Sequence, residues 1–521
     1  MLNYFLTYLS AAENYSPPLA INSSINIRIS VRMLWALGII TFIFTYVNMS
    51  QIAPNDFWWH MAVGRDILAN GNIPAVDIYS YTMAGQPYLS YQMFWLMDIW
   101  LYGWYSLGGA ELVLFIQSLI ITGTYLLIML LCWRISNRWG VTSFCLIFTI
   151  VLGIYAWNVR PQAISFLIGA IFLYGIYAYR RQPRLRWLLV FPIGMLVWVN
   201  SHGSFPVGLL LLGIWLGDEL WQVYLFWQEK KRLHLNRLFI PLAVLAVTTG
   251  VCVANPRGIG ILSYLMTMAS NPAVQNTVPE WSPPNFNTPN GPLFFTSILF
   301  TAVVLARSPR RPSFFQLACF VAFAALGLWT TRGVVWFGLI TAPVLADHIS
   351  TFRVIETLSS DQRKVRKNLQ LVNFGILFLL FGLSFISLPW FRSRLPMRPG
   401  YRSLITRDTP VDAVEFLVEH QPQGKIFNDM AFGSYLIWAA HPKYQVFSDP
   451  RIELFSQEIW DDYKLISHGR PGWREKLDEY GIQTLIVNPD EQDTLIEEVG
   501  KSAHWQLIYQ DDTAVVFSMV H

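Results

Sequence analysis

The sequence predicts a polytopic α-helical membrane protein that carries a small α/β domain at its C-terminal end. Hydrophobic residues make up 54% of the 521 residues and charged residues only 13%. Soluble proteins carry about a quarter charged residues, so most of this chain is expected inside a membrane or at its surface. Aromatic residues reach 15% and include 22 Trp, which suits side chains at the membrane–water interface.

About eleven transmembrane helices are predicted, because a spanning helix needs about 20 mostly apolar residues. Residues 1–32 lack the apolar core and cleavage site of a secretory signal, so we expect a cytoplasmic N-terminal segment and an uncleaved first helix. The runs on either side of Arg332 also fit one broken helix, which leaves the count open by two. The predicted runs are 33–49, 109–133, 140–157, 162–179, 187–200, 205–225, 238–255, 291–306, 314–331, 333–346 and 369–391.

Basic residues predict the orientation of these helices. All but four of the Lys and Arg before Arg392 fall in segments that the scheme places in the cytoplasm, as the positive-inside rule requires. The exceptions are Arg65, Arg160, Arg257 and Arg332. We therefore expect a plasma (inner) membrane protein with a cytoplasmic N-terminus and an extracytoplasmic C-terminal domain.

Three parts of the chain are expected on the outer side. The transmembrane domain, 33–391, contains two long outer loops, 50–108 and 256–290, and the first reads as two amphipathic stretches joined by a turn region at 71–87. Residues 392–521 have an ordinary soluble composition and predict a small α/β layer. Its β-like runs are Lys425–Phe427, Tyr444–Phe447, Thr484–Val487, Trp505–Tyr509 and Ala514–Phe517.

Acidic residues of the first outer loop are candidates for catalysis. Asp56 and His60 lie one helical turn apart if a helix starts at this point, so Asp56 could take a proton from an attacking hydroxyl while His60 orients it. The alternative is that Asp56 only caps the helix after Pro54. Asp77 is a third catalytic candidate, although its place in a turn also suits a structural role.

Arginines at outer helix ends are candidates for binding phosphate. Arg160, Arg257 and Arg332 each sit beside Pro or Gly where a helix ends, and the guanidinium group suits phosphate oxygens. The alternative is contact with lipid headgroups. His202 lies at another outer helix end and is added to this set. Further candidates are Arg65, expected against lipid or another loop, and Glu280, Asp449 and Arg451.

An ordered series of motifs resembles the GT-C superfamily of membrane glycosyltransferases, in particular its bacterial mannosyltransferase-like branch. The motifs run through most of the chain. They are Asp56 with Trp59-His60, Gly64-Arg65, Ile73-Pro74-Ala75-Val76-Asp77, Ser80-Tyr81-Thr82, Arg160-Pro161, Asn200-Ser201-His202-Gly203, Asn255-Pro256-Arg257-Gly258, Glu280-Trp281, Arg332, Phe427-Asn428-Asp429 and Asp449-Pro450-Arg451.

The resemblance implies a hexosyl or pentosyl transferase that moves a sugar from a polyprenyl-phosphate donor to a glycan, lipid or protein acceptor at the outer membrane face. It implies Asp56 as the base. Relatives often carry His-Glu where this chain has Tyr91-Gln92, which leaves open whether activity is kept and whether a divalent cation takes part. No metal-binding cysteine or histidine cluster and no nucleic-acid-binding surface are expected. The alternatives are a lipid or sugar transporter or flippase, and a non-catalytic scaffold of the same fold.

Overall fold

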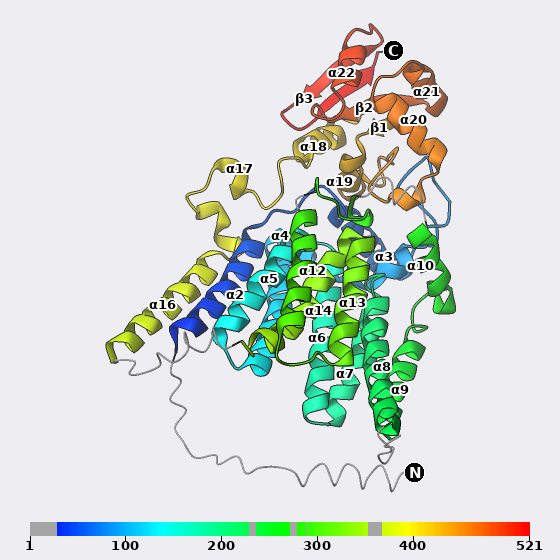
Figure 1. Cartoon of the computed structure of the whole chain (residues 1–521). Coiled ribbons are helices and arrows are strands. Elements are labelled where there is room, and N and C mark those ends of the chain that lie inside the picture. The colour runs from blue at the N-terminus through cyan, green and yellow to red at the C-terminus, as the bar shows by residue number, and fades with distance from the viewer. Residues whose placement is uncertain (1–28, 229–235, 271–278, 289, 353–366, 521) are drawn as a thin grey trace.

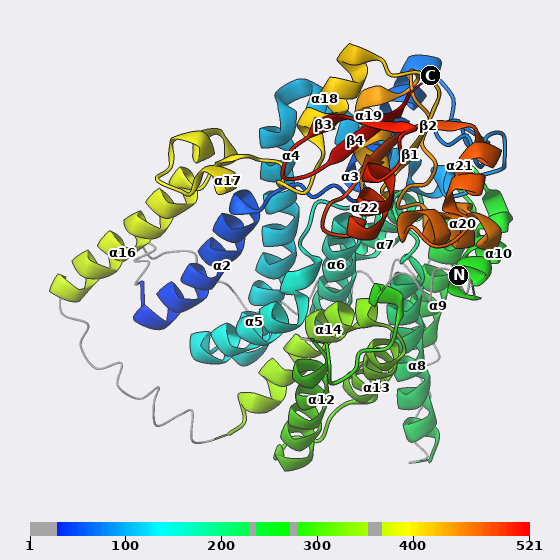
Figure 2. The ribbon, with the colours of Figure 1, turned by 90° about the horizontal axis from the view of Figure 1, so that it is seen from above.

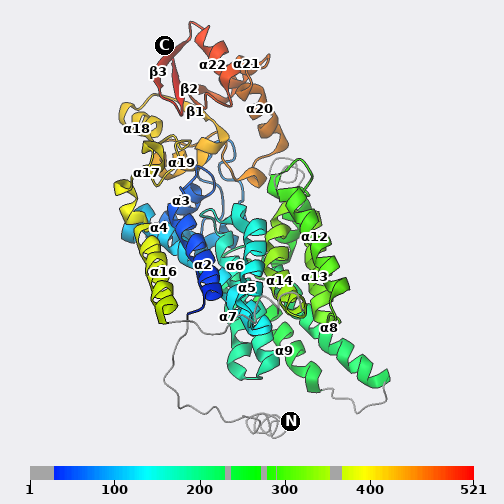
Figure 3. The ribbon, with the colours of Figure 1, turned by 60° about the vertical axis from the view of Figure 1, so that its left-hand side comes forward.

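The computed structural model describes residues 29–228, 236–270, 279–288, 290–352 and 367–520 (Figure 1). Most of the predicted N-terminal segment 1–32 and the basic residues at 230–232 and 353–366 lie outside the described residues. The C-terminal part sits at one end of a bundle of helices, and the helices of the first outer loop lie between them (Figure 1). Figure 3 shows α2 and α16 side by side at one flank of the bundle.

Every one of the eleven predicted apolar runs coincides with a helix. These helices are α2 (Val31–Met49), α4 (Tyr91–Ser136), α5 (Trp139–Gly153) extended by η1 (Ile154–Ala156), α6 (Gln162–Arg181), α7 (Leu185–Val199), α8 (Pro206–Gln228), α9 (Asn236–Val251), α12 (Asn290–Arg307), α13 (Phe314–Trp329), α14 (Thr331–Ile349) and α16 (Lys367–Ile386). Within the described residues, six of them are long and apolar enough to cross a membrane, namely α2, α4, α5 with η1, α6, α8 and α12. The chain is thus a multi-pass membrane protein, and the count of eleven spans stays a prediction.

Local sequence signals explain where several of these helices begin. Ser30 accepts a hydrogen bond from the backbone N–H of Met33 at the start of α2. Ser313 and Gln316 form a reciprocal capping box at the start of α13. Thr330 caps α14 by accepting from the N–H of Arg332. Each cap satisfies backbone donors that the first helical turn leaves without a partner.

The first outer loop contains two helices, in agreement with its two predicted amphipathic stretches. The first is α3 (Phe57–Asn70), and the second is the beginning of α4. A kink separates this part of α4 from its membrane-spanning part, because Gly108 and Gly109 leave the helical conformation and Gly109 has φ 66°. A positive φ is easily adopted by glycine, so the break falls where the sequence predicts the helix boundary.

Helices α3 and α4 approach each other closely at Gly64. A Cβ atom at this position would lie 2.1 Å from the backbone oxygen of Asp98. One turn earlier, the side chains of His60 and Asp98 join the same two helices. The two outer helices therefore form one packed pair, and α3 carries Asp56 at its beginning.

The C-terminal part contains a four-stranded sheet with the order β1-β2-β4-β3. Strands β1 (Lys425–Asn428) and β2 (Ile482–Val487) pair in parallel, whereas β4 (Val515–Met519) pairs antiparallel with both β2 and β3 (Trp505–Gln510). The flanking helices are α18 (Val411–His420), α19 (Met430–Ala440), α20 (Gln457–Ser467), α21 (Trp473–Tyr480) and α22 (Asp493–Gly500). Shorter elements are η2 (Gly258–Gly260), α10 (Ile261–Ser270), η3 (Pro279–Trp281), η4 (Pro389–Arg394), α17 (Pro399–Arg402) and η5 (Ile452–Leu454).

One predicted strand takes a different partner. Residues 444–447 do not join the sheet, because Val446 pairs instead with Ser80 of the first outer loop in a parallel bridge. Its N–H donates to the carbonyl of Tyr79 at 3.0 Å, and its carbonyl accepts from Tyr81 at 3.2 Å. This pairing depends on a segment that is distant in the sequence, so the local sequence pattern does not predict it.

The C-terminal part and the first outer loop share one hydrophobic core. Buried side chains of the loop, including Trp59, Ile67 and Tyr91, pack in the same cluster as Val414 and Phe447 of the C-terminal part. Figure 2, viewed from above, shows α3 beneath the sheet and α19. Residues on both sides of the predicted domain boundary at residue 392 therefore pack in one core.

Ion pairs at the far ends of the helices explain two further acidic residues. Arg180, at the end of α6, pairs with Asp218 of α8, and Arg310 pairs with Asp347 near the end of α14. Arg160 and Arg332 lie at the opposite ends of α6 and α14. Arg180 and Arg310 thus lie at the opposite end of the bundle from Arg160 and Arg332, as the predicted segregation of these arginines requires.

Candidate functional site

Four charged residues from separate segments form a continuous chain of ion pairs. Nε of Arg160 lies 3.4 Å from Oδ2 of Asp56, and Nη1 of Arg160 lies 2.7 Å from Oε1 of Glu280. Nη2 of Arg332 lies 3.1 Å from Oε2 of Glu280. Asp56 immediately precedes α3, Arg160 lies in the turn before α6, Glu280 is in η3, and Arg332 is in the first turn of α14. Arg160 and Arg332 thus both contact the carboxylate of Glu280, and Asp56 joins the chain through Arg160.

The second outer loop is fastened to the start of α14. Thr330 donates its hydroxyl to the carbonyl of Glu280 at 3.1 Å, while the backbone and hydroxyl of Thr331 both donate to the carbonyl of Ser282 at 3.0 Å. The guanidinium of Arg332 lies over the ring of Trp281, 4.8 Å from its centroid. These contacts fix Glu280 between the two arginines.

Charge complementarity dominates the electrostatics of this cluster. Burial alone would raise the pKa of Glu280, but Arg160 and Arg332 lower it below its usual value. Burial likewise acts to lower the pKa of Arg160, yet Asp56 and Glu280 raise it. The side chains of Asp56 and Glu280 remain 30% and 31% exposed. The carboxylate of Glu280 is therefore charged at neutral pH, and both carboxylates are accessible to a ligand.

A small pocket opens beside the ion pairs. Its lining includes Tyr155, Gln162, His202, Ser204, Glu280 and Arg332. Burial and the nearby Arg332 lower the pKa of His202 to about 3, so this histidine is neutral near pH 7. Nδ1 of His202 accepts from the backbone N–H of Ser204 at 3.2 Å, which assigns its proton to Nε2. His202 is thus a neutral hydrogen-bond donor at the pocket.

The side chain of Asp56 does not cap α3. No capping hydrogen bond joins it to the first turn of the helix, and the backbone at Asp56 is itself helical. The structure therefore does not support the capping alternative. Arg160 is the partner of the carboxylate, and the exposed part of Asp56 keeps capacity to accept another hydrogen bond.

His60 follows Asp56 by one turn, and its backbone N–H donates to the carbonyl of Asp56 at 3.2 Å. Its Nδ1 pairs with Oδ1 of Asp98 at 2.6 Å, and its ring stacks on Trp59. Burial above all lowers the pKa of His60, helped by His202 and Arg160. The expected orientation of the Asp56 carboxylate by this imidazole has no contact to support it within the described residues. Sequence analysis missed Asp98, although a single acid in an apolar amphipathic helix was a signal for it.

Arg257 lies apart from the ion-pair chain. Its guanidinium rests over the ring of Tyr264 at 5.0 Å, and its backbone N–H donates to Asn255. Its Nε and Nη1 atoms are buried without a hydrogen-bond partner. Within the described residues no ion pair joins Arg257 to Glu280, so Arg257 is not part of the ion-pair chain, and its convergence with Arg332 on one phosphate stays a prediction.

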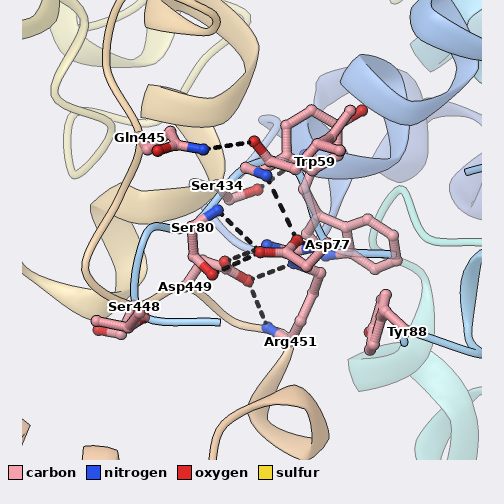
Figure 4. Close-up of polar contacts among 12 residues, drawn as sticks. Trp59, Asp77, Ser80, Tyr88, Ser434, Gln445, Ser448, Asp449 and Arg451 are labelled. Carbon is pink, nitrogen blue, oxygen red and sulfur yellow. Dashed lines mark hydrogen bonds and ion pairs between the residues drawn. The ribbon is translucent and has the colours of Figure 1, made fainter. Parts of the chain in front are cut away.

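A second charged cluster fastens the C-terminal part to the first outer loop (Figure 4). Arg451 is fully buried, with Nη1 2.5 Å from Oδ1 of Asp77 and Nη2 2.6 Å from Oδ2 of Asp449. Ser80 donates its N–H and its hydroxyl to Asp77 at 2.9 and 2.5 Å. The rings of Tyr79, Tyr88 and Tyr91 surround the guanidinium.

The geometry of this cluster corrects the prediction that Asp77 is catalytic. Asp77 is 1% exposed. Burial acts to raise its pKa, but Arg451 and Ser80 lower it, so the carboxylate stays charged. Its oxygens accept from Arg451, Ser80 and Tyr91, which leaves no access for a substrate. Asp77, Asp449 and Arg451 therefore hold the C-terminal part in place.

Two other predicted residues also contact the C-terminal part or face this cluster. Arg65 donates to the carbonyl of Trp438 at 3.0 Å and lies 5.0 Å from its ring centroid, so it contacts helix α19 rather than a loop. Tyr91 donates its hydroxyl to Asp77 at 3.0 Å. Tyr91-Gln92 thus provides no carboxylate or imidazole to a cation. Among the described residues no three His, Cys, Asp or Glu side chains gather as metal ligands.

The chain has the architecture of a multi-pass membrane protein. It is similar to the archaeal oligosaccharyltransferase AglB from Archaeoglobus fulgidus, solved with an inhibitory peptide and a dolichol phosphate, with a TM-score of 0.50 and 11% identity over 88% of this chain and 69% of that one. It is equally similar to the arabinofuranosyltransferase AftD from Mycobacteria, with a TM-score of 0.50 and 12% identity over 94% of this chain, which spans 40% of AftD. ArnT from Cupriavidus metallidurans aligns at a TM-score of 0.47 and 13% identity over 100% of this chain and 98% of that one. No protein-family model and no curated protein sequence matches the chain.

Proposed function

We propose that this protein is an inverting glycosyltransferase that moves a sugar from a polyprenyl-phosphate donor to an acceptor hydroxyl at the outer membrane face. The observation that carries the proposal is the chain Asp56–Arg160–Glu280–Arg332 at the edge of a pocket. In this chain the carboxylate of Asp56, the proposed base, contacts Arg160, and Glu280 links Arg160 to Arg332, the second proposed phosphate contact. The solved relatives with this fold include two named as sugar transferases, one of them with a dolichol phosphate bound.

Asp56 is the proposed general base. Its carboxylate is 30% exposed, and among the described residues its ion-pair partner is Arg160, at 3.4 Å from Oδ2. A carboxylate so placed accepts the proton of an acceptor hydroxyl as that oxygen attacks the anomeric carbon. General base assistance of this kind contributes about 10²–10⁴-fold to the rate.

Arg332 and Arg160 are the proposed contacts of the donor phosphate. Both arginines already hold one carboxylate, Glu280, so an incoming phosphate would exchange for it on the same guanidinium groups. His202 adds a neutral N–H donor at the same pocket. Charged hydrogen bonds to the departing phosphate stabilise the negative charge that grows on its oxygen as the bond to the sugar breaks.

Arg257 is proposed as a separate phosphate contact. Its buried Nε and Nη1 atoms lack acceptors, whereas Arg160 and Arg332 are paired with carboxylates. The neighbouring helix α10 exposes Leu262 and Met266, at 51% and 73%, on an apolar surface that suits a lipid tail. The donor would meet Arg257 at this surface before its phosphate reaches Arg332.

The proposed reaction balances without a further reactant. The acceptor oxygen forms a bond to the anomeric carbon from the side opposite the phosphate, and the carbon–oxygen bond to the phosphate breaks with its electron pair. The hydroxyl proton passes to Asp56, and polyprenyl phosphate leaves. Attack from the opposite side inverts the anomeric centre.

Transfer from a polyprenyl-phosphate hexose or pentose, labelled in the sugar, tests the proposal in detergent or nanodiscs. We expect Asp56→Asn to lower the rate of transfer at least about 100-fold, since it removes the base. Asp461→Asn is the matched control, because Asp461 is exposed on α20, where it accepts a hydrogen bond from Gln457. Full activity of a folded Asp56→Asn variant would overturn the assignment of the base. Uptake of the label into sealed vesicles without transfer would favour a transporter instead.

A further inference from the structure

A second cleft lies where the first outer loop meets the C-terminal part, away from the ion-pair chain. Its lining includes Tyr81 of the loop together with Lys425, His441, Lys443, Tyr444 and Gln445 of the C-terminal part. Among the described residues that line it there is no carboxylate, while two lysines are exposed. The cleft is therefore positively charged and carries hydrogen-bonding and aromatic groups.

Hydrogen bonds fix the walls of this cleft. The hydroxyl of Tyr81 donates to the carbonyl of Ile426 at 2.9 Å, and that of Tyr444 donates to Pro422 at 2.8 Å. Gln445 donates its side-chain amide to the carbonyl of Ile78 at 3.0 Å, across the seam. Because the walls are held by both sides of the seam, the cleft is preformed and a ligand loses little free energy in ordering it.

The two lysines of the cleft already have different contacts within the protein. Lys425 places its ammonium over the ring of Tyr81, 4.9 Å from the centroid, and Lys443 donates one hydrogen bond to the carbonyl of Val418 at 2.7 Å. An ammonium has three donors, so both retain donors for a ligand. Nδ1 of His441 is buried without a hydrogen-bond partner.

The position of the cleft relates it to Asp56. The ring of Tyr79 contacts that of His441 at 4.9 Å, and its hydroxyl donates to Asp66 at 2.7 Å. Asp66 is on α3, ten residues after Asp56, which corresponds to roughly 15 Å along the helix. A chain of several sugar units covers such a span.

We propose that this cleft binds a saccharide unit that carries a carboxylate or phosphate group, as part of the acceptor glycan. Lys425 and Lys443 would hold the anionic group, the amide of Gln445 would meet a hydroxyl, and the aromatic rings would pack on the sugar. A lining in which charged and hydrogen-bonding groups stand beside aromatic rings suits a polar, anionic ligand such as an acidic sugar. The identification of the glycan as the acceptor rests on the proposed function.

Binding of defined oligosaccharides to the full chain in nanodiscs, measured by calorimetry without donor, tests the proposal. The probes are tetragalacturonate, galacturonate and the neutral maltotetraose. We expect tetragalacturonate to bind most tightly and to weaken at high salt, because the pairing of exposed charges is screened. We expect Lys425→Gln with Lys443→Gln to weaken its binding at least about tenfold, since charged hydrogen bonds are lost.

The matched control is Lys464→Gln with Lys501→Gln, which removes the same charge from the same part of the chain outside the cleft. Equal binding by both double variants, equal binding of maltotetraose, or failure of tetragalacturonate to bind the wild type would overturn the proposal. Galacturonate binding as tightly as the tetramer would overturn recognition of a glycan chain. Asp56→Asn should bind the probe normally, so loss of transfer and loss of glycan binding are separable.

Discussion

Arg160 and Glu280 are joined by an ion pair of 2.7 Å between Nη1 and Oε1, although 120 residues separate them in the sequence. The same carboxylate also pairs with Arg332, so one acid neutralises two arginines that belong to different helices. This arrangement has a direct consequence for a phosphate ligand, because the phosphate and Glu280 would compete for the same guanidinium groups.

Glu280→Gln tests this competition. The substitution removes a negative charge from between Arg160 and Arg332, so we expect the affinity for polyprenyl phosphate to increase about tenfold, corresponding to the loss of one charged hydrogen bond in the unbound state. Product release should slow accordingly. Binding measured by native mass spectrometry, with Glu458→Gln as a surface control, checks the expectation. Weaker binding in a folded variant would instead make Glu280 a residue that positions the arginines.

The close approach of α3 and α4 predicts a large effect of one methyl group. In Gly64→Ala the new Cβ would meet the backbone oxygen of Asp98 at 2.1 Å, so the two helices must separate. Overpacking of this kind costs about 1–3 kcal/mol. Gly103 lies in the outer part of α4, and a Cβ atom there would meet no atom within 4 Å. Gly103→Ala should therefore be neutral or stabilising. Thermal unfolding of both variants decides, and equal midpoints would contradict the packing argument.

Most of the helical framework was predictable because it depends on local signals. Apolar runs, the glycine pair at 108–109 and the segregation of arginine all act over short stretches of sequence. The predicted arginines also indicated the site, and two of them, Arg160 and Arg332, join the ion-pair chain through packing that brings separate helix ends together. Motif order pointed to Asp56, Arg160 and Arg332.

Long-range pairing was not predictable from those signals. Asp77 and Asp56 look alike in the sequence, since each is an acid in the first outer loop. Asp77 becomes a buried structural residue only because Arg451, 374 residues away in the sequence, packs against it and donates a hydrogen bond. Val446 leaves the sheet for Ser80 for the same reason, and His60 pairs with Asp98 rather than with Asp56 because α4 packs against α3 at Gly64.

The neutral state of His202 predicts a pH dependence of the unfolding free energy. Its pKa of about 3 in the folded protein lies below the usual 6.5, so the unfolded chain binds its proton more readily between these values. The stabilisation that goes with neutral His202 is therefore present above about pH 6.5 and is lost progressively as the pH falls toward 3. We expect His202→Gln to flatten the pH dependence of unfolding in this range. An unchanged profile in the variant would show that other groups govern it.

The buried Arg451 predicts a strong coupling between the first outer loop and the C-terminal part. Arg451→Met leaves Asp77 and Asp449 without a counter-charge in a buried place, which costs about 3–5 kcal/mol. In Asp77→Asn the arginine keeps Asp449, so the loss should be smaller. The double variant should cost less free energy of unfolding than the sum of the two single variants, and a double-mutant cycle measures that coupling.

The pKa of Asp77 is lowered in the folded protein, so its contribution to stability is present above about pH 4 and is lost as the pH falls further. Asp77→Asn should therefore make the free energy of unfolding less sensitive to acid. If the effects of the two substitutions are additive, and if Asp77→Asn keeps the acid sensitivity of the wild type, the ion pair between Asp77 and Arg451 does not have this role.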